Sequence, residues 1–257
     1  MKIIVLMKQV ANKDAVLRIG PDEKWINETD VAQQTNESDG YALEEALRVK
    51  EAGEGEVVVC TLGPQSAKTV IKDALARGAD RAIHVVADNA NKLSPYQIAK
   101  AIADAIREEN ADLVMTGLQS DDASYGQTGV VLAELLGIPH ATLIIEVDRG
   151  SLGETLRVKR ELESGWYQWF TYNLPSLLTI QSGISQIRYA SLKGIMAAKK
   201  KEIKEVTPSI EAFAGAQTIE KVYMPLKTKQ TQMLGNGDAK AGAVELVEKL
   251  RTEIRVL

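Results

Sequence analysis

The sequence predicts an α/β protein built around a mostly parallel, doubly wound sheet. Short aliphatic runs alternate with helical patterns from residue 3 to residue 148. Alternation at this spacing is typical of strand–helix–strand units, whose right-handed crossovers place helices on both faces of a parallel sheet. After residue 150 the pattern changes, and the remaining sequence predicts a β-hairpin extension followed by a long C-terminal arm.

Each element of the alternating part has its own local signal. The expected strands are short, mainly aliphatic runs at 3–7, 57–62, 81–86, 112–116 and 140–148. The expected helices lie between them at 41–52, 66–77, 94–109 and about 127–136. Asp39 or Ser38 can cap the first helix, Gly78 ends the second, and Ser94 with Pro95 begins the third.

The second part of the chain carries weaker signals. Further elements are expected at 157–162, 166–172, 177–181 and 238–251. The first two flank Glu163-Ser164-Gly165 and predict a hairpin. No strand–helix alternation is visible from residue 197 onward, and a tail of this length is too short to bury a core of its own. We therefore expect residues 1–206 to form the α/β domain and residues 207–257 to form an arm that wraps this domain or another subunit.

Composition narrows the classes of function. The chain has 257 residues, of which 45% are hydrophobic and 26% charged, as in ordinary globular proteins. Its formal net charge of −4 gives no electrostatic reason to expect nucleic acid as a partner. No apolar run approaches the ~20 residues that span a bilayer, and residues 1–8 do not resemble a signal peptide. The one cysteine, Cys60, lies in an apolar run, so we expect a buried thiol and a cytoplasmic protein.

Polar or glycine-containing loops follow three of the predicted strands. They begin after Met7, Leu62 and Thr116. Because ligands of open parallel sheets bind beyond the carboxyl ends of the strands, we expect these loops to converge on one site. A polar loop at 20–38 has a length that is more often functional than decorative.

The loop at 117–129 has the strongest functional character. Its small and polar residues include Gly126, Gly129, Ser124, Gln127 and Thr128. One interpretation is a phosphate cradle, in which the loop delivers backbone N–H groups and hydroxyls to the positive end of the following helix. The other is an ordinary helix entry capped by Ser124 or Asp122. The loop is neither a Walker loop nor a Gly-x-Gly-x-x-Gly turn.

Other kinds of site have less support. Asp121 and Asp122 could bind a metal, but adjacent side chains usually diverge and no His or Cys is nearby in the sequence. The two histidines, His84 and His140, are in no visible Ser/His/Asp arrangement, which argues against independent catalysis. We therefore expect neither a metal site nor catalytic residues.

Six segments together resemble the β subunit of electron-transfer flavoproteins. They read VLMKQV from residue 5, NESDGYALEEALRVKE from 36, LGPQSAKTVIKDALARGADRAIHV from 62, the loop and helix at 112–137, RELESGW from 160 and RYASLKGIMAAKKKEI from 188. The resemblance covers nearly the whole chain in the order of the family, and the last segment is its most specific part. The chain looks most similar to the electron-transfer flavoproteins that serve trimethylamine dehydrogenase.

The resemblance implies a flavodoxin-like or adenine-nucleotide-hydrolase-like domain in an obligate heterodimer with an α subunit. In that family the α subunit holds most of the redox-active FAD, and the β subunit binds one AMP with a structural role. The dimer carries electrons from an acyl-CoA or amine dehydrogenase to a quinone oxidoreductase or a similar acceptor. The implied protein is an electron carrier without catalysis of its own, without nucleic acid and without membrane insertion.

Carried over by position, the resemblance assigns three sets of residues. The nucleotide would be bound by Leu6, Lys8, Asn36, Asp39, Leu62, Gly63, Gln119, Ser120, Asp121, Asp122, Ser124, Tyr125, Gly126, Gln127 and Thr128. A recognition loop at about 184–200 would dock the dehydrogenase through Tyr189, Leu192, Ile195 and Met196. The residues facing the α subunit and its flavin would be Lys13, Ser38 and Glu161. The hairpin at about 155–173 would belong to the first domain, and the arm at 207–257 would wrap the α subunit.

Two alternatives stay open. Bifurcating members of the family hold a second FAD in place of AMP. They usually read Gly-Asp-Thr-Ala-Gln-Val-Gly-Pro where this chain has residues 123–130, and Asn-Pro where it has Asn36-Glu37, which favours AMP here. From a different class, a freestanding adenine-nucleotide-binding protein of the universal-stress type would need neither the long tail nor the recognition loop.

Overall fold

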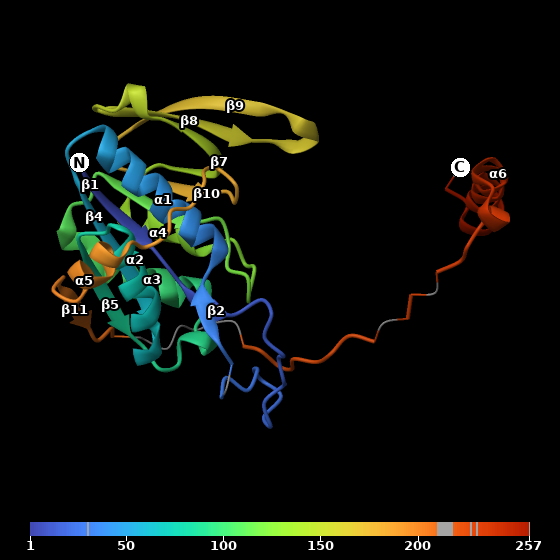
Figure 1. Cartoon of the computed structure of the whole chain (residues 1–257), viewed down its shortest axis with the longest axis horizontal. Coiled ribbons are helices and arrows are strands. Elements are labelled where there is room, and N and C mark those ends of the chain that lie inside the picture. Colours follow the sequence, from blue (N-terminus) through green and yellow to red (C-terminus); the bar gives the residue numbers. More distant parts are fainter. Residues whose placement is uncertain (30, 210–217, 227, 230, 257) are drawn as a thin grey trace. The chain divides into compact units, whose positions relative to one another are not determined.

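A computed structural model describes residues 1–29, 31–209, 218–226, 228–229 and 231–256 (Figure 1). The chain divides into two compact units, Met1–Val222 and Tyr223–Leu257. The described residues of the first unit form a nine-stranded sheet in the order β11-β5-β4-β1-β6-β10-β7-β8-β9. The mostly parallel, doubly wound α/β fold expected from the sequence is therefore confirmed.

With the exception of β11, the strands of this sheet lie in segments that the sequence predicts as strands. They are β1 (Lys2–Leu6), β4 (Glu56–Gly63), β5 (Arg81–Val86), β6 (Leu113–Gly117), β7 (His140–Asp148), β8 (Thr155–Glu161), β9 (Tyr167–Asn173), β10 (Ser176–Ile180) and β11 (Ile203–Val206). All pairings from β11 to β7 are parallel. The hairpin of β8 and β9 extends the sheet with antiparallel pairings beyond β7. Two short strands, β2 (Gln9–Ala11) and β3 (Gln33–Thr35), pair separately.

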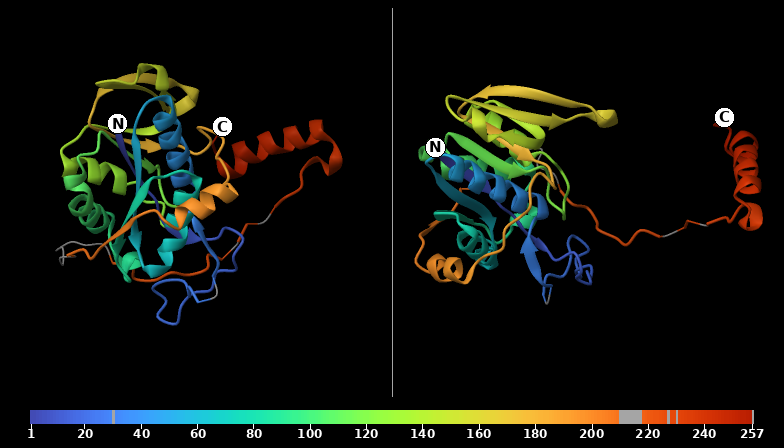
Figure 2. Two further views of the ribbon diagram at one scale, coloured as in Figure 1. Left: turned by 60° about the vertical axis from the view of Figure 1, so that its left-hand side comes forward. Right: turned by 45° about the horizontal axis from the view of Figure 1, so that its top comes forward.

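Helices cover both faces of the sheet (Figure 2). On one face lie α1 (Glu37–Ala52), α2 (Lys68–Arg77) and α5 (Leu192–Ala198), and on the other lie α3 (Pro95–Ile106) and α4 (Thr128–Leu136). The protein has two hydrophobic cores, one on each face of the sheet, because successive side chains of β1 point to opposite faces. Ile3 and Val5 belong to the core beneath α1, α2 and α5, and Ile4 belongs to the core beneath α3 and α4. Each such fully buried aliphatic side chain contributes about 2 kcal/mol to stability.

Helix α1 begins at Glu37, earlier than the expected start at residue 41. Asn36 occupies its N-cap position, so Ser38 and Asp39 lie inside the first turn and their predicted capping role is wrong. The early start escaped sequence reasoning because the first turn is polar. Apolar periodicity begins only after that turn, at Ala42.

The alternation of strand and helix continues beyond residue 197, where none was expected. Strand β11 follows α5 and pairs in parallel with β5, placing Ile203 beside Ala82 and Val206 beside Val85. This edge strand has four residues, of which Lys204 and Glu205 are exposed. Its apolar signal is therefore too short to be recognised from the sequence.

Single-turn helices connect several of these elements. They are η1 (Gln65–Ala67), η2 (Ala90–Lys92), η3 (Arg107–Glu109), η4 (Arg149–Ser151) and η5 (Glu163–Gly165). The last of these forms the expected hairpin turn between β8 and β9. Ser94 caps α3 through a complete capping box, and Gly78 ends α2, as the sequence predicts.

The second unit contains η6 (Gly235–Gly237), α6 (Ala239–Lys249) and a final π-helical turn, η7 (Leu250–Ile254). Asp238 caps α6 by accepting hydrogen bonds from two backbone N–H groups. None of the described residues of this unit is buried. Residues 210–217, 227, 230 and 257 of the expected arm lie outside the described residues, and its wrapping of another subunit stays a prediction.

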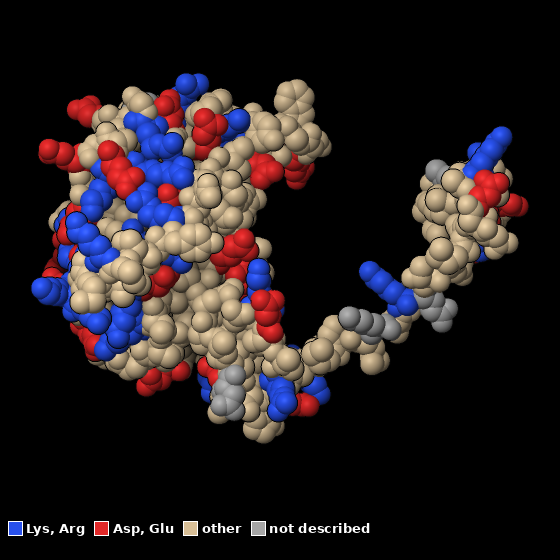
Figure 3. All heavy atoms as spheres, viewed as in Figure 1, with Lys and Arg blue, Asp and Glu red and all other residues tan. Residues whose placement is uncertain are grey.

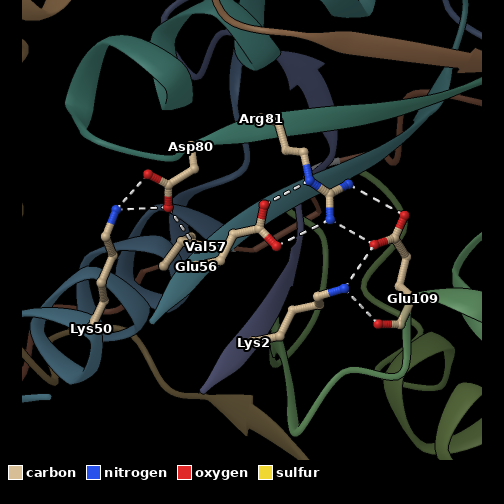
Figure 4. A network of polar contacts seen from close by, with 7 residues as sticks. All are labelled: Lys2, Lys50, Glu56, Val57, Asp80, Arg81 and Glu109. Carbon is tan, nitrogen blue, oxygen red and sulfur yellow. Dashed lines mark hydrogen bonds and ion pairs between the residues drawn. The ribbon is translucent and has the colours of Figure 1, made fainter. Parts of the chain in front are cut away.

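Charged side chains pair with one another at the amino ends of the strands (Figure 4). Arg81 lies between two carboxylates, with its Nε 2.7 Å from Glu56 Oε1 and its Nη2 2.6 Å from Glu109 Oε2. The Lys2 ammonium is 3.3 Å from Glu109 Oε2. Elsewhere, acidic and basic side chains are intermixed over the face shown in Figure 3.

Candidate functional site

A cavity of about 150 Å³ opens at the carboxyl ends of β1, β4 and β6, roughly ten times the space that one ordered water needs. The loops that follow β1 and β6 reach it, as the sequence predicts. The loop after β4 does not, because none of residues 63–66 lines the cavity, and the loop after β5 contributes Ala90, Asn91, Lys92 and Leu93 instead. Of the predicted nucleotide-binding residues, it is lined by Leu6, Lys8, Asn36, Asp39, Leu62, Gln119, Ser120, Tyr125, Gly126, Gln127 and Thr128. The remaining four, Gly63, Asp121, Asp122 and Ser124, are not part of its lining.

The first turn of α1 holds the loop at 117–129 in place. Asn36 Nδ2 donates to the carbonyl of Gln119 at 2.9 Å, and Asn36 Oδ1 accepts from the N–H of Asp121 at 2.8 Å. Ser38 Oγ donates to the same Gln119 carbonyl at 2.8 Å. These side chains therefore tie two distant parts of the sequence together beside the cavity.

Asp39 joins the ends of β1 and β6 from the same turn. Its carboxylate accepts from the N–H of Lys8 at 2.8 Å and from the N–H of Gly117 at 3.0 Å. Burial raises the pKa of Asp39 to about 7, although these N–H donors act in the opposite direction. A Cβ atom on Gly117 would lie 2.2 Å from Ser38 Oγ, so the approach of α1 to β6 requires glycine there.

The start of α4 lies at the cavity, since Gln127, Thr128 and Gly129 line it. Gln127 occupies the N-cap position but makes no side-chain hydrogen bond to the first-turn amides of this helix. The capping roles weighed for Ser124 and Asp122 are therefore wrong. The first-turn N–H groups and the helix dipole favour an anion at this position.

Lys8 adds a positive charge to the same side of the cavity. Its Nζ lies 2.6 Å from Asp122 Oδ1 and 3.4 Å from Ser120 Oγ. The neighbouring Asp121 turns elsewhere and accepts from the N–H of Glu37 at 3.1 Å. Because the two aspartates diverge, they do not form a joint metal site, and the described residues contain no group of three or more His, Cys, Asp or Glu that could hold a metal ion.

The side of the cavity formed by β4, the loop after β5 and α3 is largely apolar, and sequence reasoning missed most of it. Side chains of Leu62, Leu93, Pro95, Ile98 and Ile102 line it, and the polar residues Asn91, Lys92 and Ser94 also belong to this part of the lining. The last three apolar residues lie at the start and on the inner stripe of α3, whose periodicity indicates only a helix packed on the sheet. The Ser94-Pro95 helix start was the only signal that placed this end of α3 near the carboxyl ends of the strands.

Two further residues that the sequence did not identify, Trp25 and Ile219, also line the cavity. The segment containing Ile219 is attached to the loop containing Trp25. The N–H of Val222 donates to the carbonyl of Glu23 at 2.8 Å, and Lys221 Nζ lies 2.9 Å from Glu23 Oε2. A strap of the chain, residues 218–222, therefore borders the cavity.

The predicted recognition segment, residues 184–200, presents an apolar surface. Tyr189 is 95% exposed, Leu192 85%, Met196 63% and Ile195 44%. Large apolar side chains gathered at such exposure are typical of a surface that contacts another molecule. These residues lie on or just before α5, away from the cavity at the carboxyl ends of the strands.

The residues predicted to face an α subunit have different environments. Lys13 is exposed in the turn after β2. Glu161, at the end of β8, accepts a hydrogen bond from Gln181 Nε2 at 3.1 Å. Ser38 is 5% exposed, and its hydroxyl already donates a hydrogen bond to the backbone carbonyl of Gln119. Their contacts with another subunit stay predictions.

Of the remaining reactive side chains, the two histidines lie outside the cavity lining, whereas Cys60 is part of it. His84 is buried in β5, where its Nε2 lies 3.1 Å from the carbonyl oxygen of Gly63, and His140 is exposed at the start of β7. Cys60 is buried, and burial raises the pKa of its thiol to about 12, which disfavours the nucleophilic thiolate form. Across the described ranges, no helix has the length and apolarity needed to cross a membrane.

Comparison with known proteins assigns this architecture to a family. The sequence profile of the electron transfer flavoprotein domain matches residues 24–211. The chain is 33% identical to the electron transfer flavoprotein subunit beta of Methylophilus methylotrophus, over 95% of this chain and 96% of that protein. It is 36% identical over the full length of both chains to the mitochondrial subunit beta of Oryza sativa subsp. indica, and 34% identical to the human subunit over 81% of this chain and 82% of that one. The chain therefore belongs to the electron transfer flavoprotein family, among its β subunits.

Proposed function

We propose that this β subunit binds one AMP in the cavity as a structural element and pairs with an α subunit that holds most of the FAD. The observation that carries the proposal is the division of the cavity into a side suited to an anion and an apolar side. An adenine nucleotide has the same division between its phosphate and its base. The flavin supplies the redox chemistry when bound, and this chain supplies binding and orientation.

The residues fit such a nucleotide in three respects. The first-turn amides of α4 and the Lys8 ammonium suit the phosphate. Gly126, with a φ of 61°, lets the loop backbone turn close to the ligand. Leu62, Ile98 and Ile102 offer apolar contact to a base.

The proposed α subunit would also cover the C-terminal unit. No described residue of Tyr223–Leu257 is buried, and on α6 Val244 is 64% exposed, Leu246 47% and Val247 41%. A unit of this size does not reach stability without further burial, so it is expected to pack against a partner. The single cysteine is a buried thiol, which is compatible with the cytoplasm as the proposed compartment.

The nucleotide content of the purified heterodimer tests the first part. An acid extract should contain one FAD and one AMP per heterodimer, identified by chromatography and quantified by absorbance. Two flavins and no AMP would replace the proposal by the bifurcating alternative. ATP hydrolysis by a stable monomer would favour the freestanding class instead.

We further propose that the recognition segment docks an acyl-CoA or amine dehydrogenase, from which electrons pass through the flavin to a quinone oxidoreductase or similar acceptor. The support is the exposure of Leu192 and its apolar neighbours on one surface. Leu192→Ala should raise the KM for the donor dehydrogenase about tenfold or more, as for an interface anchor, and leave the nucleotide content unchanged. Transfer kinetics equal to those of the unaltered protein would contradict docking at this surface.

A further inference from the structure

The recognition segment combines an exposed apolar surface with a rigid attachment to the fold. Leu192 and Tyr189 are almost fully exposed, whereas Ala198 at the end of the same helix is buried. A helix of seven residues is too short to be stable by itself in water. Its conformation must therefore be imposed by the contacts on its other side.

The first attachment is a cluster of charged side chains on α1. Arg188 Nε donates to Glu44 Oε2 at 2.9 Å, its backbone N–H donates to the same oxygen at 3.1 Å, and its Nη2 donates to Glu51 Oε2 at 3.0 Å. Arg48 holds Glu44 from the other side at 2.8 Å and also donates to the carbonyl of Gln186 at 3.0 Å. Arg188 thus links the segment to two carboxylates that are about two helical turns apart on α1.

The carboxylate at the centre of this cluster is well satisfied. The side chain of Glu44 is 3% exposed. Although burial acts to raise its pKa, hydrogen bonds from Arg188 and Arg48 hold the pKa of Glu44 below its usual value. Because Arg48 remains when Arg188 is removed, loss of Arg188 leaves Glu44 paired, and the domain is expected to fold.

The second attachment lies on α2. A Cβ atom on Gly194 would sit 2.1 Å from the carbonyl oxygen of Ala76, so α5 touches the backbone of α2 at this glycine. Just past the segment, Lys201 Nζ donates to the carbonyls of Leu75 at 2.9 Å and Ala79 at 2.5 Å. These carbonyls lie at the C-terminal end of α2, where a cation is favoured. Between the two attachments, Ser191 Oγ accepts from the N–H of Gly194 at 3.0 Å and caps α5.

We propose that Arg188 is a positioning residue that holds the recognition segment in the conformation needed for docking. Gly194 and Lys201 form the second attachment of this segment. This inference rests on the proposed docking function. Arg188 lies four residues before Leu192 and touches α1, so it fixes where the apolar surface begins. A segment fixed in its bound conformation loses less entropy when the partner binds, and this strengthens association without changing electron transfer inside the complex.

The test compares three variants of the intact heterodimer with the unaltered protein: Arg188→Ala, Arg188→Lys and Leu192→Ala. The first readout is amide hydrogen exchange. Arg188→Ala should accelerate exchange in residues 189–198 at least about tenfold, as expected when local opening becomes easier, and leave α3 and α4 unchanged. Leu192→Ala should leave this exchange within about twofold of normal, because Leu192 contacts solvent.

The second readout is reduction by trimethylamine dehydrogenase with trimethylamine and, separately, by a medium-chain acyl-CoA dehydrogenase with octanoyl-CoA. For whichever reduces the unaltered heterodimer faster, Arg188→Ala should raise the KM for the dehydrogenase about tenfold with kcat within about twofold. Arg188→Lys should recover part of the loss, because a lysine keeps the charge but cannot bridge both carboxylates. Lys100→Ala, which breaks an exposed ion pair on α3, is the matched control and should change neither readout.

The outcomes separate the two proposals. If Leu192→Ala raises KM but Arg188→Ala does not, docking stands and the positioning role of Arg188 is wrong. If neither variant changes KM, docking at this surface is wrong. Normal amide exchange in Arg188→Ala overturns the positioning role whatever the kinetics, because the segment would then keep its shape without the arginine. Reduction by neither dehydrogenase would leave amide exchange as the deciding readout.

Discussion

The two ends of the same parallel sheet use polar residues in opposite ways. At the amino ends, Lys2, Glu56, Arg81 and Glu109 pair with one another at 3.3 Å or less. At the carboxyl ends, polar side chains bind backbone groups and hold loops around a cavity, as Asp39 does between β1 and β6. The charged groups at the amino ends therefore satisfy one another, whereas the polar groups at the carboxyl ends leave a cavity with backbone N–H groups beside it.

The difference follows from the direction of the strands and helices. In a doubly wound sheet, helices such as α4 begin near the carboxyl ends of the strands, so their first-turn N–H groups and positive dipole ends gather there. Glycines such as Gly117 and Gly129 let these segments approach one another closely. A cluster of charges is therefore weak evidence of a site when its members satisfy each other, and a partly satisfied helix start beside a cavity is stronger evidence.

The largest effect is expected from adding a side-chain atom at Gly117, where α1 closely approaches the carboxyl end of β6. Gly117→Ala would place a Cβ atom 2.2 Å from Ser38 Oγ and 2.8 Å from the backbone nitrogen of Asp39. The strain should lower the free energy of unfolding by about 3 kcal/mol and abolish retention of the nucleotide. Urea unfolding and nucleotide extraction measure the two effects. Gly53→Ala, whose added Cβ would meet nothing within 4 Å, should change neither by much, and a Gly117→Ala protein that keeps both would refute this packing.

A smaller effect without loss of ligand is expected at the amino ends. Arg81→Ala should lower the free energy of unfolding by about 2 kcal/mol, because it leaves Glu109, which is 13% exposed, with Lys2 as its remaining cation. Nucleotide content should be unchanged. Lys100→Ala breaks a pair in which both side chains are 48% exposed and should cost less than about 1 kcal/mol. Loss of nucleotide from Arg81→Ala in proportion to stability would mean that the two ends of the sheet are coupled.

Much of this fold is readable from local patterns because its signals are strong and repeated. The apolar runs of β1, β4, β5 and β6 are buried on both faces, so they appear as short continuous blocks separated by helical stripes. Strand β11 escapes prediction because an edge strand buries little. The convergence of the loops after β1 and β6 followed from the topology of a parallel sheet and needed no knowledge of side-chain contacts. The loop after β5, which lines the cavity in place of the loop after β4, was not predicted.

The cavity was only partly predictable, for physical reasons. Loop residues such as Gln127 and Thr128 carry a visible excess of polar and small groups. By contrast, Ile98 and Ile102 lie on one apolar stripe of α3 that both packs in the core and lines the cavity. Helical periodicity therefore cannot distinguish a core residue from a cavity residue. Trp25 and Ile219 line it from segments far apart in the sequence, and composition and spacing cannot reveal this placement.

The pH dependence of stability provides a finer test of the carboxyl ends. Burial raises the pKa of Asp39 from its ordinary 3.8 to about 7, so between about pH 4 and pH 7 the folded state holds a proton that the unfolded state releases. The free energy of unfolding should therefore fall as pH rises through this window, by up to about 1 kcal/mol per pH unit, and level off above it. Asp39→Asn should remove this slope, and the exposed Asp88→Asn should keep it. An unchanged slope in Asp39→Asn would mean that the N–H groups of Lys8 and Gly117 keep the carboxylate ionised.

The smallest effect is expected from Trp25. It lines the cavity together with Ile219 of the strap at 218–222, and its Nε1 donates to Glu28 Oε1 at 2.9 Å. Trp25→Ala should remove part of the lining without altering the anion-binding side, so bound nucleotide should dissociate about three to ten times faster, a change of roughly 1 kcal/mol. Exchange of bound nucleotide against an excess of labelled AMP measures this rate in the heterodimer. Val16→Ala, a change at an 81% exposed residue in the same part of the chain, is the control. Equal release from both variants would show that Trp25 does not contribute to retention of the nucleotide.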